Sequence, residues 1–263
     1  MTKILFLGDI FSQVGCLLVE TRLPALIGRE GLDLCLANAE NAQDGTGLSL
    51  ASAQKLLDSG LDALSGGNHT FRFHELESML DSHQRLIRPA NYPDPCPGRG
   101  WTILKCPSGV KVGFANLMGR VYMKGALDCP FKKADQLIGE MREKGANILI
   151  VDFHAEVTSE KVALARYLDG RVEAVIGTHT HVQTNDARIL PGGTAYITDA
   201  GMTGPHGGII GMQSQEVIDS FIMGRTKRFK PAKKLPILQG VIMVFDTTGR
   251  AESITPVNLE GLA

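Results

Sequence analysis

Five short apolar segments, spread along the chain, each lead into a side chain that can bind a metal ion. They are Lys3–Leu7, Leu32–Ala37, Asp62–Leu64, Ile148–Phe153 and Ala174–Ile176. Each is short and is followed by polar or Gly-containing residues, which is typical of buried strands. In open α/β sheets the carboxyl ends of the strands meet along one edge, where the loops form ligand sites. This pattern therefore predicts a site built from residues that are remote in the chain.

Segments with helical spacing of apolar residues lie between the strand candidates. They cover about 14–27, 50–57, 73–80, 134–144 and 159–168. Buried strands that alternate with amphipathic helices indicate an α/β architecture. Two strand-rich sections, a hairpin over 101–118 with its turn at Pro107–Gly109 and another over 240–257, depart from this alternation. They suggest two stacked sheets with outer helices, in a single domain covering residues 1–263.

The residues at the strand ends form a chemically consistent set. They are Asp9, Glu40, Asn68, His154, His179 and His181. Taken singly, each has a plain alternative: Asp9 could cap a helix, Asn68 could belong to an ordinary turn, and His154 could be a satisfied core histidine. The spacing of His179 and His181 is the strongest signal, because alternate residues of an extended backbone project to the same side.

Carboxylate, carboxamide and imidazole groups without a thiolate suit manganese, iron or zinc in a reactive site better than a structural zinc site. A carboxylate can bridge two ions, and two metals about 3.5–4 Å apart are a common arrangement for phosphoester hydrolysis. Such ions would polarise the phosphoryl group and lower the pKa of a bridging water. The set therefore predicts a metal-dependent phosphoric ester hydrolase.

The formal net charge of −1 gives no general attraction to nucleic acids or anionic membranes. A small phosphoester remains the expected partner, because bound metal would supply the positive charge. One basic patch stands out, made of Arg225, Lys227, Arg228, Lys230, Lys233 and Lys234. It is either a solvated helix end or loop, or a contact for a phosphate or a partner.

The 5 cysteines are odd in number and form no CxxC pair, which is the usage of a reducing compartment. The first residues lack the long apolar region of a signal peptide, and no run of about 18 apolar residues indicates a membrane span. We therefore expect a cytoplasmic protein. The oligomeric state is left open, with a homo-oligomer among the options.

Several of these segments resemble known phosphoesterases. The pairs and triplets Gly8-Asp9, Gly67-Asn68-His69 and His179-Thr180-His181, with a lone strand-end His154, resemble the calcineurin-like metallophosphoesterases. A closer resemblance is to the bacterial YmdB family, and its motifs occur in the same order over nearly the whole chain. They are GDIFSQVG (8–15), NAENAQDGTGL (38–48), GGNHTF (66–71), RPANYP (88–93), DFHAEVTSEK (152–161), GTHTHVQT (177–184) and ITDAGMTGP (197–205).

The resemblance implies a four-layer αββα sandwich with two mixed sheets, outer helices and a two-metal centre. It implies iron or manganese, with zinc as the alternative, and phosphodiesterase activity on 2′,3′-cyclic and 3′,5′-cyclic nucleotides. Matched residue by residue, Asp9 and His181 would hold the first metal together with Asn41. Asn68, His154 and His179 would hold the second, and Glu40 would bridge the two.

One departure concerns the first motif, where Phe11 occupies the position of a histidine in the wider superfamily. Asn41 would replace that histidine, which makes the first site richer in oxygen and favours harder ions. The bridging acid is Glu40 where the wider superfamily has an aspartate, so the coordination number and the metal stay open.

The expected mechanism is attack on phosphorus by hydroxide generated on the ions. His69, next to the expected ligand Asn68, would donate a proton or a hydrogen bond to the substrate. Asp152 would orient an imidazole, with a plain salt bridge or capping role as the alternative. His206, in a Gly-rich loop, is a candidate substrate contact, with a plain loop histidine as the alternative. Phosphomonoesterase, nucleotidase or phosphoprotein phosphatase activity at the same centre remains open, as does a non-catalytic scaffold.

Overall fold

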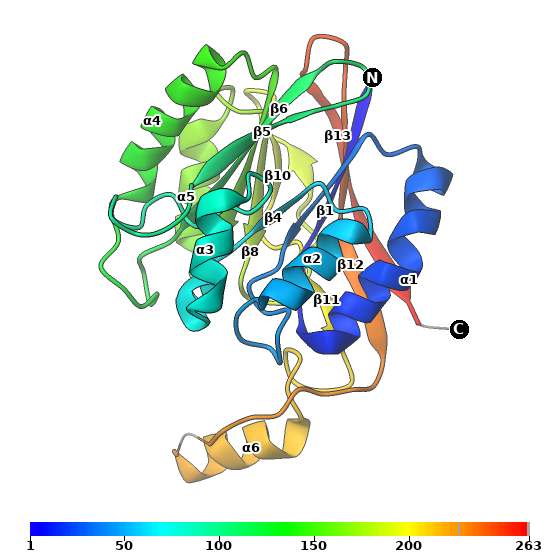
Figure 1. Ribbon diagram of the computed structural model, residues 1–263, viewed down its shortest axis with the longest axis vertical. Coiled ribbons are helices and arrows are strands. Elements are labelled where there is room, and N and C mark those ends of the chain that lie inside the picture. Colours follow the sequence, from blue (N-terminus) through cyan, green and yellow to red (C-terminus); the bar gives the residue numbers. More distant parts are fainter. Residues whose placement is uncertain (226, 262–263) are drawn as a thin grey trace.

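A computed structural model describes residues 1–225 and 227–261 of the protein, and two sheets lie face to face at its centre (Figure 1). The first sheet has 7 strands. In spatial order they are β2 (Asp9–Ile10), β11 (Met202–Pro205), β12 (Pro236–Phe245), β1 (Thr2–Leu7), β3 (Leu34–Asn38) and β4 (Ala63–Ser65), with β13 (Ala251–Glu260) paired to β12. Strands β1, β3 and β4 are parallel, whereas β12 is antiparallel to β1, so the sheet is mixed.

The second sheet has 6 strands. Their order is β5 (Trp101–Lys105), β6 (Lys111–Met118), β7 (Ile148–His154), β8 (Ala174–Thr178), β10 (Ala195–Ile197) and β9 (Arg188–Ile189). The four inner strands are parallel, and the edge strands β5 and β9 are antiparallel to their neighbours. The predicted hairpins, β5–β6 and β12–β13, are both present.

Helices cover the outer faces of both sheets (Figure 1). The first sheet packs against α1 (Ser12–Glu30), α2 (Leu50–Asp58) and α3 (Glu75–Ser82). The second packs against α4 (Pro130–Glu143) and α5 (Thr158–Leu168). A short 3-10 helix, η1 (Thr70–Arg72), precedes α3.

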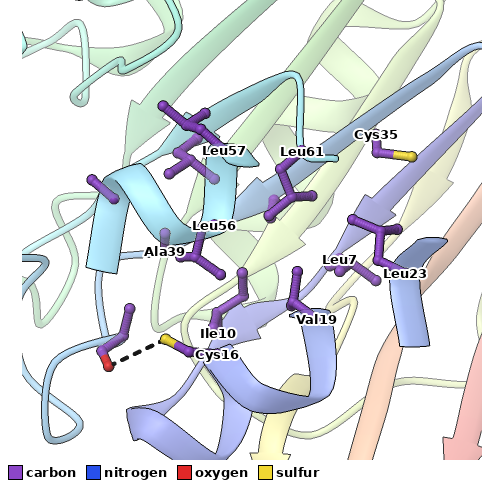
Figure 2. Packing of buried hydrophobic residues seen from close by; sticks show 14 of the residues in the cluster. Leu7, Ile10, Cys16, Val19, Leu23, Cys35, Ala39, Leu56, Leu57 and Leu61 are labelled. Carbon is purple, nitrogen blue, oxygen red and sulfur yellow. Dashed lines mark hydrogen bonds between the residues drawn. The ribbon is translucent and has the colours of Figure 1, made fainter. Parts of the chain in front are cut away.

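Alternation along the strands divides the core into three layers. In β1, Ile4 and Phe6 join the layer between the sheets, and Leu5 and Leu7 join the layer under α1 and α2. Successive side chains of a strand point to opposite faces, so a continuous apolar strand fills both layers. Figure 2 shows the helix side, where Val19 of α1, Leu56 of α2 and Leu7 belong to one buried cluster. The predicted αββα sandwich with mixed sheets is confirmed.

One segment, residues 206–235, leaves these layers and is called the arm below. It carries α6 (Ser214–Met223) and projects beyond the body of the molecule (Figure 1). The basic patch falls in this arm, in a loop after α6, with residue 226 outside the described residues. Within residues 1–225 and 227–261, no helix has the length and apolar character needed to cross a membrane.

Candidate metal centre

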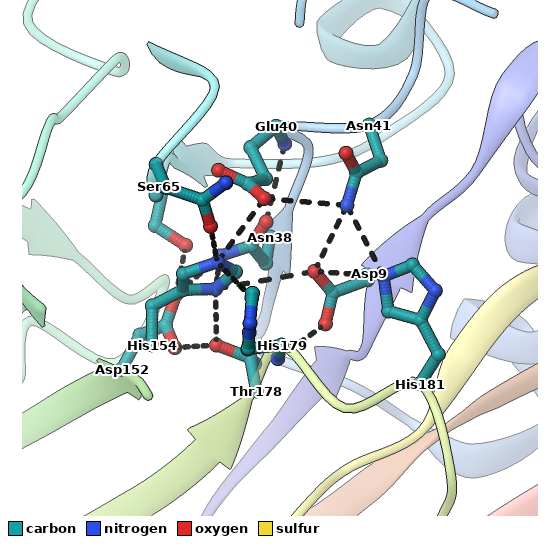
Figure 3. Close-up of polar contacts among 12 residues, drawn as sticks. Asp9, Asn38, Glu40, Asn41, Ser65, Asp152, His154, Thr178, His179 and His181 are labelled. Carbon is teal, nitrogen blue, oxygen red and sulfur yellow. Dashed lines mark hydrogen bonds and ion pairs between the residues drawn. The ribbon is translucent and has the colours of Figure 1, made fainter. Parts of the chain in front are cut away.

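The carboxyl ends of β1, β3, β4, β7 and β8 bring the predicted ligands to one place (Figure 3). Three of the ligands have almost no contact with solvent: Asp9 is 0% exposed, Glu40 1% and His154 0%. Acids buried to this degree need a compensating charge close by. The ends of the parallel strands therefore create a polar, charged centre at the edge of an apolar core.

His154 lies at the middle of one group of donor atoms. Its Nε2 is 3.1 Å from Glu40 Oε1, 3.1 Å from Asn68 Oδ1 and 3.0 Å from His179 Nδ1. The donor atoms of Glu40, His154 and His179 all lie within 4.8 Å of one another, so these three residues could hold a metal ion.

Asp9, Asn41 and His181 form a second group beside the first. Asp9 Oδ1 is 3.6 Å from His181 Nε2, and Asn41 Nδ2 is 3.2 Å from the same nitrogen. Glu40 Oε1 is 3.3 Å from Asn41 Nδ2, so this carboxylate lies between the two groups. The spatial division of the residues follows the division expected from the family resemblance.

The outer hydrogen bonds of His154 set its tautomer. Its Nδ1 is 3.0 Å from Thr178 Oγ1, and Thr178 donates to Asp152 Oδ1 at 2.7 Å. Because Thr178 uses its proton on Asp152, its oxygen accepts from Nδ1, and His154 Nε2 faces inward. The orienting role expected for Asp152 therefore has a structural route, through Thr178.

His179 and His181 are arranged in the same way. His179 Nε2 is 3.1 Å from Glu156 Oε2, and His181 Nδ1 is 3.1 Å from the carbonyl of Ile210. Each outer nitrogen thus faces an acceptor and carries the proton, which leaves the inner nitrogen with a lone pair. Three imidazole nitrogens and two buried carboxylates converge, and this donor set fits bound cations.

The electrostatics of the centre favour positive charge. Burial acts to lower the pKa of His154, but the charges of Glu40 and Asp9 raise it to about 9. Burial acts to raise the pKa of Glu40, yet the charge of His154 and hydrogen bonds from its neighbours hold it well below its usual value. Burial, with the charge of His154, lowers the pKa of His179 to about 4, so this imidazole is neutral at pH 7.

The backbone that carries the two late histidines differs from the prediction. Strand β8 ends at Thr178, and His179 and His181 have positive φ angles of 98° and 63°. The expected extended backbone is therefore wrong, because left-handed residues are not part of a strand. A tight turn, rather than strand alternation, points both rings into the centre.

A buried ion pair fixes this turn from behind. Lys161 of α5 is 1% exposed, and its Nζ is 2.8 Å from Asp199 Oδ2. The same carboxylate oxygen accepts from the backbone N–H of Thr180 at 3.1 Å and from its hydroxyl at 2.7 Å. Thr180 lies between the two histidines, so the ion pair holds both of them in place.

Asn41 and His69 complete the rim of the centre. Asn41 presents its NH₂ group to Glu40 and His181, while its oxygen is 2.8 Å from His69 Nδ1. The backbone N–H of His69 donates to Glu40 Oε2 at 2.8 Å. This contact ties the position of the His69 side chain to the central carboxylate.

A cavity of about 330 Å³ opens above the centre. Its largely apolar lining includes Phe11 and Phe229, together with Glu40, His69 and His181. His206 is not among the residues that line this cavity, and its Nε2 is 3.0 Å from the carbonyl of Met202. A substrate contact by His206 therefore stays a prediction without a supporting contact.

A family model described as YmdB-like protein matches residues 5–257 of the chain. The chain belongs to the YmdB-like family. A Bacillus subtilis relative, the 2′,3′-cyclic-nucleotide 2′-phosphodiesterase, is 45% identical over 253 residues, which are 96% of this chain and 95% of the relative.

Two solved structures are similar to this YmdB-like chain over almost its whole length. A protein of Thermus thermophilus, described as hypothetical, has a TM-score of 0.92 and 40% identity, covering 98% of this chain and 99% of its own. A structure described as a novel phosphatase of Mycoplasma pneumoniae has a TM-score of 0.91 and 34% identity, covering 98% and 93%. The names of the relatives agree with the predicted class of phosphoric ester hydrolases, and the prediction is confirmed at that level.

Sequence reasoning missed several residues that shape the centre of this YmdB-like protein. They are Glu156, Lys161, Thr178 and Asp199, together with Phe229 in the arm. The first four lie inside segments already quoted for the family resemblance, which was the available signal. Their roles depend on contacts between distant segments, which spacing along the chain does not predict.

Proposed function

We propose that this protein is a phosphodiesterase that uses two metal ions to hydrolyse 2′,3′-cyclic and 3′,5′-cyclic nucleotides. The observation that carries the proposal is the convergence of three inward-facing imidazole nitrogens on two buried carboxylates. Such a set is suited to cations, and cations at this edge would attract an anionic phosphoester into the cavity. The activity named for the Bacillus subtilis relative supports the 2′,3′-cyclic substrate.

Asp9, Asn41 and His181 would hold one ion, Asn68, His154 and His179 the other, and Glu40 would bridge them. Asn41 would turn its amide by half a rotation, since its NH₂ group now faces Asp9 and Glu40. Iron or manganese suits the mixed oxygen and nitrogen donors, with zinc as the alternative. When bound, the ions would polarise the phosphoryl group and lower the pKa of a water molecule.

In this proposal, His69 is the general acid that protonates the leaving oxygen. Its Nδ1 is held by Asn41 at 2.8 Å, and the ring lines the cavity. The ring is therefore fixed in orientation while Nε2 remains available to substrate. A proton on Nε2 would pass to the ribose oxygen as its bond to phosphorus breaks.

The first test compares classes of ester. Metal-loaded protein is given 2′,3′-cyclic AMP, 3′,5′-cyclic AMP and adenosine monophosphates at equal concentration, and release of each product is followed by chromatography. We expect the cyclic diesters to be hydrolysed faster than the monoesters. Faster hydrolysis of the monoesters would replace the proposal with phosphomonoesterase activity, and turnover of none would leave the scaffold alternative.

The second test isolates His69. His69→Ala should lower kcat by about 10²–10⁴-fold with the metal content unchanged, because an acid is removed and no metal ligand is. His74→Ala is the matched control, since the His74 side chain is 95% exposed and faces solvent. Metal analysis by mass spectrometry accompanies the kinetics. Loss of metal in His69→Ala would refute the proposed role.

A further inference from the structure

A second hollow continues outward from the cavity above the centre. It has a volume of about 550 Å³ and shares Thr46, Met212 and Phe229 with that cavity. The two hollows therefore adjoin at these residues, and only the first of them contains predicted ligands. The second hollow, called the outer groove, is lined by Asp44, Thr46, Arg72, Met212, Arg228, Phe229, Lys230 and Pro231.

Close backbone approach builds the walls of this groove. A Cβ on Gly45 would lie 2.4 Å from the Phe11 ring, and a Cβ on Gly47 would lie 2.8 Å from Cβ of Arg72. Both glycines have positive φ angles, 79° and 86°. The loop that follows β3 can therefore lie flat against Phe11 and Arg72 only because these positions lack side chains.

The outer groove carries more positive than negative charge, with Arg72, Arg228 and Lys230 facing one acid, Asp44. Lys230 Nζ is 3.9 Å from Glu216 Oε1, which satisfies part of its charge. Across the described ranges 1–225 and 227–261, the two guanidinium groups have no ion-pair partner. Unpaired arginines beside a groove are suited to phosphate, because their planar groups match its oxygens.

We propose that this groove binds the 3′-terminal segment of an RNA strand, with its terminal cyclic phosphate at the ligand cluster and the preceding phosphodiester at Arg72 and Arg228. The inference rests on the proposed function, and it extends the substrate class from free cyclic nucleotides to RNA ends. The terminal base would lie on Phe229, which with Met212 lines both hollows. Bases stack on aromatic side chains with little dependence on sequence.

The reaction at such an end is balanced without any further reactant. The oxygen of a water molecule bonds to phosphorus, one of the two bonds from phosphorus to a ribose oxygen breaks, and that ribose oxygen takes a proton. The RNA then ends in a phosphomonoester. The expectation of no nucleic-acid partner rested on the total charge of −1. The outer groove nevertheless has a local excess of positively charged side chains.

The test measures binding to metal-loaded protein by calorimetry. The probes are an RNA trinucleotide with a 3′-phosphate and the corresponding nucleoside 3′-monophosphate, neither of which contains a cyclic diester. We expect the trinucleotide to bind about tenfold more tightly, because it adds phosphate and base contacts. In the double variant Arg72→Gln, Arg228→Gln this ratio should fall towards one.

The double variant Lys233→Gln, Lys234→Gln is the matched control, since it removes the same charge from the arm outside the groove and should keep the ratio. A wild-type ratio near one, or an unchanged ratio in the arginine variant, would overturn the inference. Equal affinity for an abasic trinucleotide would also overturn it, because charge alone would then explain binding. Turnover of cyclic-phosphate substrates is measured separately, so a binding preference without turnover contradicts the proposed function and not the groove.

Discussion

Lys161 and Asp199 form a salt bridge that has no access to solvent, with exposures of 1% and 0%. Two charges removed from water are stable only while they are paired and hydrogen-bonded. The Asp199 carboxylate also accepts hydrogen bonds from the backbone N–H groups of Thr180 and Gly201, in addition to its ion pair with Lys161. This pair therefore links the stability of the fold to the position of His179 and His181.

Lys161→Met is expected to lower the free energy of unfolding by about 3–5 kcal/mol, because Asp199 is left as an unpaired buried charge. Urea denaturation followed by circular dichroism measures the change. Lys55→Met is the matched control, since Lys55 pairs with Glu20 at the surface and the exposed pair contributes at most about 1 kcal/mol. A similarly small change in the free energy of unfolding in both variants would show that the buried pair contributes no more to stability than the surface pair.

The sequence predicts which candidate ligands lie close together better than it predicts the residues that orient them. Asp9 and His154 follow clear strand signals, so their meeting at one edge is expected from the topology of an α/β sheet. The contact from Lys161 to Asp199 joins residues 38 positions apart on a helix and a loop, and no periodicity predicts such a pair. The same holds for Glu156, which reads as a loop acid until its distance to His179 is known.

The turn between β4 and η1 illustrates a constraint at the scale of an element. A Cβ on Gly67 would lie 2.3 Å from Glu40 Oε2 and 2.5 Å from His154 Nε2. Both side chains are buried and hydrogen-bonded, so they have no space to move away. The turn therefore needs glycine to let the two donor groups meet.

Gly67→Ala should lower metal affinity by about 10–100-fold with the fold retained. The added methyl group would displace the side chains of Glu40 and His154, and the expected effect is that of losing a residue that orients a metal ligand. The measurement is metal titration followed by calorimetry, with circular dichroism to check the fold. Gly139→Ala in α4 is the control, because a Cβ there meets nothing within 4 Å. Wild-type affinity in Gly67→Ala would contradict the crowding seen in the structure.

Element boundaries were predicted best where the apolar pattern is continuous. The strand predicted over Ile148–Phe153 is β7, which ends one residue later at His154. Helix α4 begins at Pro130, before the predicted start near residue 134. Proline fits the first turn of a helix, and the polar or aromatic residues that follow it do not show the apolar spacing used for the prediction. The arm with α6 was not predicted as an element, since its helix packs little against the core and buries only Val217.

At the scale of the whole molecule, the centre joins the two sheets. Asp9 and Glu40 come from the first sheet, and His154 and His179 come from the second. Bound cations would therefore attract acids and imidazoles across the interface between the sheets. Ligands that bind only the folded state stabilise it by mass action.

Removal of metal by a chelator is expected to lower Tm by about 5–10 °C, which corresponds to a metal present at about 100 times its Kd. Differential scanning calorimetry before chelation, after it and after addition of manganese measures the change. Glu40→Gln is the control, because it removes the central carboxylate and should make Tm nearly insensitive to the chelator. Identical Tm values for wild-type protein in all three states would contradict a role for metal between the sheets.

Strands β1 and β12 pair along their full common length, from Thr2 with Phe245 to Leu7 with Gly240. The N–H of Gly8 continues this ladder by donating to the carbonyl of Gln239 at 3.0 Å, directly before Asp9. Most of the described chain lies between these two strands, so the ladder joins segments that are remote in sequence. The backbone that leads into Asp9 therefore depends on a pairing between remote segments of the chain, and such long-range pairing is slow to form.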